Sequence, residues 1–188
     1  MRVFLDFEAS SLGKQGYPIE VAWVFEDGEG ESHLIRPAPG WMDWDDEAEA
    51  IHHISRDRLA SEGKAHGDVA ARMIEALTGH DLYASAPSWD GKWLSALLRA
   101  AALPRHALRL RDTEQAQRER AREILSGVLS AEDLRGWVDS LVARVLAEDD
   151  GIVRHRALDD AKQELRRWLA IGRLAEQERD RRAAQGRL

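Results

Sequence analysis

The order of strand-like and helix-like segments constrains this chain more than any other feature of its sequence. Three β-rich apolar runs come first, at residues 3–8, 19–25 and 32–36, and the turn signal Asp27-Gly28 separates the second run from the third. Short turns between three such runs predict an antiparallel meander.

Apolar residues at helical spacing follow, and they alternate with two further strand-like segments. We expect, in chain order, a helix through 69–77 that ends at Gly79, a buried strand at 82–85, a helix from Pro87, a strand at 108–111, and helices at 113–126, at 131–147 and from Ala157. This order predicts an α/β fold in which helices flank a central mixed five-stranded sheet.

Chain length and composition favour one domain. The 188 residues are 44% apolar, which is enough for one buried core, and no long linker divides them. Residues 176–188 have almost no apolar content, so we expect a polar tail that frays, after a domain that spans residues 1–175.

Composition also excludes several classes of site and location. The absence of cysteine excludes disulfides and thiolate ligands, so any metal must be held by oxygen or imidazole. The net charge of −7 argues against bulk coating of nucleic acid, although residues 1–100 carry 9 basic and 18 acidic side chains and the rest of the chain is slightly basic. No run reaches the roughly 20 apolar residues of a membrane span, and we expect a cytoplasmic protein with no membrane partner.

Two carboxylates, Asp6 and Glu8, interrupt the first apolar run. Because side chains alternate across a strand, both lie on one face, roughly 6 to 7 Å apart along the chain. Two ionised acids away from water repel each other unless a cation or a proton compensates them. They are therefore candidate metal ligands, and the alternative is a strand end that reaches solvent.

Two further acids follow the starts of helices. Asp90 lies in the first turn of the helix from Pro87, where the helix dipole alone favours an acid, so a plain helix start is the alternative. Asp160 lies in the first turn of the last helix, and His155 precedes it by five residues. The side chains of His155 and Asp160 converge only if His155 lies in the loop before this helix. Residues 148–151 would make that loop mobile, and an exposed loop histidine is the alternative.

Together these residues form a pattern that resembles a known family, the DEDDh branch of the DnaQ-like 3′–5′ exonucleases. Three motifs carry the resemblance: Phe4-Leu5-Asp6-Phe7-Glu8-Ala9-Ser10-Ser11-Leu12, Ser88-Trp89-Asp90 and His155-Arg156-Ala157-Leu158-Asp159-Asp160. Tyr17-Pro18-Ile19-Glu20-Val21-Ala22 and Ile51-His52-His53-Ile54-Ser55 are similar to the family's second strand and its nucleotide-contacting loop. The resemblance spans nearly the whole chain and implies an RNase H-like three-layer fold.

The resemblance implies a two-metal phosphodiester hydrolase. Asp6, Glu8, Asp90 and Asp160 would hold two divalent cations, Mg²⁺ or Mn²⁺, with Asp6 bridging both. His155 would act as general base on the attacking water, a task that suits the pKa of imidazole. The expected product is a 5′-mononucleotide released from the 3′ end of single-stranded DNA or RNA.

Substrate contacts are also implied by the resemblance. They are assigned to Ala9, Ser10, Leu12, His52, Ile54 and Trp89. Leu12 would wedge against the terminal base, whereas an ordinary loop leucine over the core is the alternative. Trp41 and Trp44 in an acidic loop are candidates for stacking on bases, while Trp23, Trp93 and Trp168 lie on apolar faces and are expected in the core.

Two alternatives from other classes stay open. The first is a nucleic-acid-binding or protein-binding module that keeps the fold without turnover. The second is an interaction subunit whose Arg/Glu-rich C-terminal helices dock a protein partner or form a homodimer. The sequence does not decide between DNA and RNA.

Overall fold

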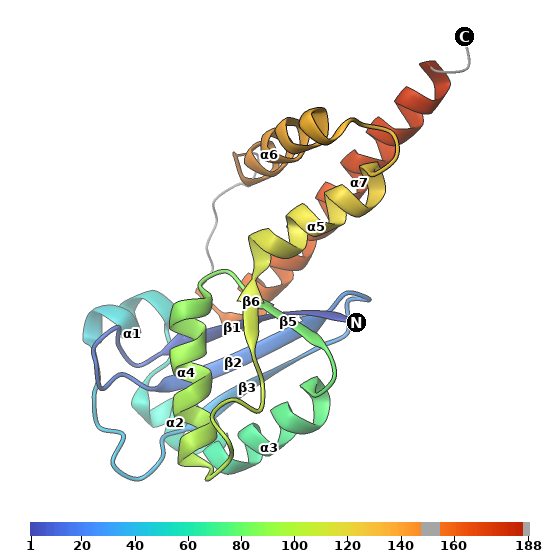
Figure 1. Ribbon diagram of the computed structural model, residues 1–188. Coiled ribbons are helices and arrows are strands. Elements are labelled where there is room, and N and C mark those ends of the chain that lie inside the picture. Colours follow the sequence, from blue (N-terminus) through green and yellow to red (C-terminus); the bar gives the residue numbers. More distant parts are fainter. Residues whose placement is uncertain (148–154, 186–188) are drawn as a thin grey trace.

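A computed structural model describes residues 1–147 and 155–185 of the chain, and it is built around one six-stranded mixed sheet (Figure 1). The strands are β1 (Arg2–Ala9), β2 (Pro18–Phe25), β3 (Gly30–Arg36), β4 (Lys64–Ala65), β5 (Asp81–Ala84) and β6 (Leu110–Asp112), in the spatial order β4-β3-β2-β1-β5-β6. β1, β2 and β3 form the predicted antiparallel meander, whereas β5 is parallel to β1 and β6 is parallel to β5.

Seven helices surround or extend this sheet in the described part of the chain. They are α1 (Asp46–His52), α2 (Arg56–Glu62), α3 (His66–Leu77), α4 (Pro87–Ala100), α5 (Thr113–Leu125), α6 (Ala131–Ala147) and α7 (Ala157–Gln185). The α/β class and the order of the expected elements are therefore confirmed, whereas α1, α2 and β4 were not expected. Within residues 1–147 and 155–185, none of these helices combines the length and the apolar character of a membrane span.

The alternation of β1 divides the core into two layers. Val3, Leu5 and Phe7 pack in one cluster with buried residues of α3 and α4. Phe4 points to the opposite face, in a second cluster with Leu165 of α7 and with Ala116 of α5. Asp6 and Glu8 share the face of Phe4, so the strand directs both carboxylates toward α7.

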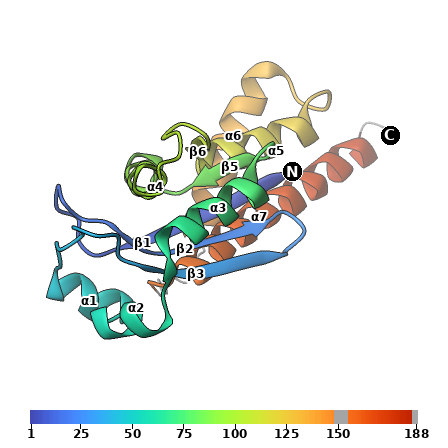
Figure 2. The same ribbon diagram turned by 90° about the horizontal axis from the view of Figure 1, so that it is seen from below.

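Helices α5, α6 and the second half of α7 project beyond the sheet as a helical arm (Figure 1). The arm has its own apolar cluster, which includes Leu125 of α5, Leu141 of α6 and Ile171 of α7. Helices α1 and α2 lie at the other end of the sheet, as the view from below also shows (Figure 2).

The structure corrects three expectations. The sheet has six strands, because the two-residue β4 pairs through its backbone with Ile35 and Arg36, and such pairing leaves no apolar pattern. The acidic loop after Trp41 contains α1, a helix that buries only His52 and is marked only by its Asp45 cap.

The C-terminal expectation is the third correction. A frayed end over 176–188 is wrong as far as Gln185, because α7 continues to that residue. Ala175 packs in the arm, and Glu178 accepts hydrogen bonds from Arg181 and Arg182 one turn away. Residues 186–188 and the expected mobile loop at 148–151 lie outside the described residues.

Candidate active site and metal centre

The candidate site begins at the carboxyl end of β1. The parallel pairing of β1 with β5 runs from Arg2 to Phe4, so Asp6 and Glu8 lie beyond the last paired residues. Both are half-buried, and they face α7 rather than α4. The sequence-based prediction that these two acids share a face is confirmed.

Asp160 completes a cluster of three acids. It lies in the first turn of α7, which packs along the Phe4 face of β1. Asp6, Glu8 and Asp160 each offer one carboxylate oxygen, and these atoms all lie within 4.8 Å of one another. Residues far apart in sequence therefore converge as the motif spacing predicts.

Asp90 is the fourth predicted acid, and it lies in the first turn of α4. Only 4% of its surface is exposed, and its Oδ2 has no hydrogen-bond partner among the described residues. Backbone groups of Ala86 and Phe7 lower the pKa of this carboxyl group, against the burial that raises it, so the carboxylate lies beside the end of β1. A helix-start acid would face water, so this burial favours a ligand-binding role.

Burial, together with nearby charges for Asp6 and Glu8, raises the pKa values of three of these acids, Asp6, Glu8 and Asp90. Burial is the largest cause for each, and it raises the pKa of Glu8 to about 8 and that of Asp90 to about 7. The pKa of Asp6 also lies well above its usual value, through burial and then through the charges of Asp90, Glu8 and Asp160. Without a cation, this cluster holds protons at neutral pH.

This donor set fits hard divalent cations. Carboxylate oxygens are the ligands that Mg²⁺ and Mn²⁺ prefer, and a cation would compensate both the burial of these acids and the repulsion between them. The buried Oδ2 of Asp90 is an acceptor that such an ion would satisfy.

Glu164 is an acid of this region that the motif reading missed. It lies one helical turn after Asp160, only 8% of it is exposed, and its charge contributes to the raised pKa of Asp6. Its carboxylate also pairs with Arg167. The signal available in the sequence was its i+4 spacing from Asp160, which places both on one helix face.

His155 is exposed and lies two residues before α7. Its φ of 47° is left-handed, a backbone conformation that histidine adopts more readily than most residues. The predicted loop position of His155, outside the helix that carries Asp160, is therefore confirmed. Its role as a base stays a prediction.

The loop after β1 carries three of the predicted substrate contacts. Ala9 is half-buried, and the buried Ser10 closes the loop by accepting a hydrogen bond from Tyr17 N–H at 3.0 Å. Leu12 is 70% exposed at the tip, consistent with a wedge. The loop requires Gly16, where a Cβ would collide with the carbonyl of Ser11.

His52 and Ile54 lie at the end of α1 and just beyond it. The His52 Nδ1 accepts a hydrogen bond from Ile54 N–H at 3.0 Å, and the His52 Nε2 is buried with no partner among the described residues. Ile54 is fully buried against Tyr17 and Ile19. The structure thus gives both residues a packing role, and their contact with nucleotide stays a prediction.

Trp89 is the tryptophan best placed for stacking. It is 43% exposed at the start of α4 and lies stacked on the buried Trp93, with ring centroids 6.0 Å apart. Lys92 covers both rings and donates a hydrogen bond to Gly13 O at 2.6 Å, which connects α4 to the Leu12 loop.

The two tryptophans expected to stack on bases are already engaged. Trp41 stacks on Tyr17 at 5.1 Å, and Trp44 donates a hydrogen bond to Glu49 at 2.8 Å while the Arg56 guanidinium covers its ring. Trp23, Trp93 and Trp168 are in the core, as predicted.

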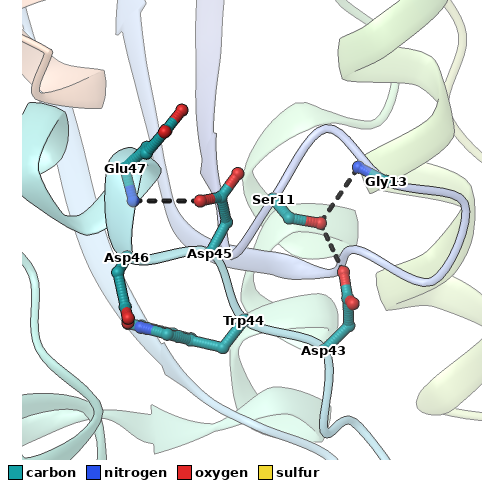
Figure 3. A pocket seen from close by; sticks show the side chains of 7 residues that line it. All are labelled: Ser11, Gly13, Asp43, Trp44, Asp45, Asp46 and Glu47. Carbon is teal, nitrogen blue, oxygen red and sulfur yellow. Dashed lines mark hydrogen bonds between the residues drawn. The ribbon is translucent and has the colours of Figure 1, made fainter.

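An acidic pocket of about 560 Å³ lies on the other side of the Leu12 loop (Figure 3). Its lining residues are Ser11, Gly13, Asp43, Trp44, Asp45, Asp46 and Glu47. The Ser11 hydroxyl donates to the Asp43 carboxylate and accepts from Gly13 N–H at 3.0 Å. Four carboxylates at this pocket would repel a phosphodiester backbone.

Comparisons with known proteins identify the fold. No protein-family model and no curated protein matches the chain. Solved structures do: an E. coli exonuclease I–single-stranded DNA complex in a zinc-bound form has a TM-score of 0.63 and 17% identity over 98% of this chain. The same enzyme with a dA16 oligonucleotide gives a TM-score of 0.64 with 16% identity over 95% of this chain.

Exonuclease I from Methylocaldum szegediense is similar to the same degree, with a TM-score of 0.62 and 17% identity over 89% of this chain. This chain spans only 40 to 42% of the chain length in these three structures. The comparisons therefore confirm the RNase H-like fold, with six strands in place of the expected five.

Proposed function

We propose that this chain is a metal-dependent 3′–5′ exonuclease that releases 5′-mononucleotides from single-stranded nucleic acid. The observation that carries the proposal is the convergence of Asp6, Glu8 and Asp160 within 4.8 Å, beside a fourth buried acid, Asp90. A cluster of four half-buried and buried carboxylates is costly in its ionised form unless cations bind it.

Each acid has a proposed role in this site. Asp6, Glu8, Asp90 and Asp160 would hold two divalent cations, Mg²⁺ or Mn²⁺, with Asp6 shared between them. Such cations supply charge stabilisation at the phosphate and lower the pKa of a bound water. His155 would take the proton from the attacking water, and its exposed loop position leaves it accessible to substrate.

The surface around the site supports a path for the strand. Leu12, Trp89 and Lys92 offer an apolar tip, a stacking face and a cation on one side of the loop. The acidic pocket at Asp43 and Asp45 lies on the other side. Phosphates would therefore be favoured along α4 and disfavoured along the acidic loop.

Membership of the DnaQ-like exonucleases, in the DEDDh branch, is part of the proposal. The three motifs and their convergence support it. So do the names of the similar structures, which describe exonuclease I with single-stranded DNA and in zinc-bound and metal-free forms.

A gel time course tests the proposal. Single-stranded DNA and RNA of one sequence, labelled at the 5′ end, are incubated with Mg²⁺, with Mn²⁺ and with EDTA, using wild type and Asp6→Asn. We expect a ladder that shortens from the 3′ end only with metal and only in wild type, and the faster substrate identifies the preferred nucleic acid.

The opposite result points to another class. If neither substrate is cut and wild type and Asp6→Asn behave alike, the hydrolase is excluded. A binding module or an interaction subunit that docks a partner through its C-terminal helices is then the better interpretation.

A further inference from the structure

A further acid, Glu20, lies next to the site on β2, and no motif of the catalytic set includes it. Glu20 pairs directly with Glu8 across the two strands, and only 1% of its surface is exposed. Two carboxylates on adjacent strands repel each other unless one of them has its own counterion.

Arg156 is that counterion, and it directly follows His155 in the chain. Arg156 Nε donates to Glu20 Oε2 at 3.0 Å and Arg156 Nη2 donates to Glu20 Oε1 at 2.7 Å, which is a two-point fork. Ser32 Oγ donates to the same carboxylate at 3.2 Å.

Glu20 also binds the first turn of α7 directly. The Ala157 N–H donates to Glu20 Oε2 at 3.2 Å, so a strand carboxylate satisfies one of the free N–H groups at the start of this helix. Ala157 is fully buried. The start of α7 is therefore fixed by both a charge pair and a backbone hydrogen bond.

The backbone of Arg156 passes this constraint on to the site. Its carbonyl oxygen accepts hydrogen bonds from Asp159 N–H at 2.9 Å and Asp160 N–H at 3.1 Å. His155 therefore directly precedes Arg156 in the chain, and the helical turn that carries Asp160 begins directly after it. Arg156 is also close enough to lower the pKa of Glu8, against the burial and the nearby acids that raise it.

We propose that Glu20 and Arg156 are positioning residues that hold the His155–Asp160 turn against the carboxyl end of β1. This inference rests on the proposed function, since it explains what holds two of the proposed catalytic groups, His155 and Asp160, in place. A buried ion pair alone is a weak source of stability, whereas a fork that fixes a helix start controls geometry. Small displacements of reacting groups cost large factors in rate.

The test uses three variants of the full chain: Glu20→Gln, Arg156→Gln and Arg156→Lys. Glu178→Gln is the matched control, because Glu178 also accepts from two arginines on α7 but lies far along the helix from Asp160. For each protein we would measure the unfolding midpoint, Mn²⁺ binding by titration calorimetry, and kcat and KM on a single-stranded oligonucleotide.

We expect Glu20→Gln and Arg156→Gln to weaken Mn²⁺ binding and kcat by about 10- to 100-fold each, with KM changed by less than about threefold. Arg156→Lys should retain part of both, because it keeps the charge and loses the fork. Glu178→Gln should match wild type. Arg156→Lys also serves if Glu20→Gln does not fold.

The outcomes separate the two proposals. If wild type binds Mn²⁺ and cleaves while all three variants match it, the positioning role is wrong and the nuclease stands. If kcat falls only in proportion to lost folded protein, the pair is merely structural and the inference is overturned. If wild type neither binds Mn²⁺ nor cleaves, the proposed function itself fails, and the inference fails with it.

Discussion

The ring of Phe4 lies 6.0 Å from the ring of Trp168, at an interplanar angle of 50°. Phe4 is two residues before Asp6 on the same face of β1, and Trp168 is about two helical turns after Asp160 on α7. This contact therefore sets how far along β1 the helix lies. It brings Asp160 level with the carboxylates of the strand.

Trp168→Ala should cost about 3 to 5 kcal/mol of unfolding free energy, because it empties a buried site between the sheet and α7. Urea unfolding of the metal-free protein measures this change. Leu169→Ala is the control, since Leu169 is 39% exposed and should change stability by less than about 0.5 kcal/mol. Equal effects of the two substitutions would contradict the proposed role of the Phe4–Trp168 contact in positioning α7 along β1.

Asp6→Asn should reduce metal-dependent cleavage by more than about 100-fold, because it removes the acid proposed to bind both cations. The metal-free variant should be as stable as wild type or about 1 kcal/mol more stable, since a neutral amide relieves the repulsion within the cluster. Gel assays and thermal unfolding check the two parts. Undiminished turnover would refute the site assignment.

The metal-free protein should lose stability as pH rises from 5 to 8.5. Unfolded carboxyl groups have pKa values near about 4, whereas Glu8 and Asp90 in the fold have pKa values of about 8 and about 7. The folded state therefore holds protons that the unfolded state releases, and a loss on the order of 6 kcal/mol is expected through this range.

Unfolding in urea at several pH values, with EDTA present, measures this slope. Mg²⁺ at saturating concentration should restore stability at pH 8.5, because a cation replaces the protons. The double variant Glu8→Gln/Asp90→Asn should have a flatter profile. A metal-free wild type that becomes more stable toward pH 8.5 would be inconsistent with the raised pKa values.

Much of the site could be predicted because its residues depend on local rules. The period of two in β1 places Asp6 and Glu8 on one face, and the start of α4 directly after β5 places Asp90 at the carboxyl edge of the sheet. These rules act within a few residues, so a sequence pattern carries them, whereas the position of Asp160 beside β1 depends on the packing of α7.

Other features depend on tertiary contacts that leave no local pattern. The fork between Glu20 and Arg156 joins residues from distant segments, and nothing near either residue indicates its partner. The two-residue β4 forms only because β3 offers a free edge. The engagement of Trp41 with Tyr17 depends on how the acidic loop folds back over β2.

Trp89→Ala should raise KM for a single-stranded oligonucleotide by about 5- to 100-fold while kcat changes little, because stacking on one base contributes about 1 to 3 kcal/mol. Trp89→Phe keeps an aromatic face and should recover most of the affinity. Trp44→Phe is the control, since Trp44 lines the acidic pocket and not the proposed strand path along α4.

The measurement is KM for oligonucleotides of increasing length, because a stacking site a fixed distance from the metal centre affects only substrates long enough to reach it. An unchanged KM at every length would move the strand path away from α4 and leave the Leu12 loop as the surface to test.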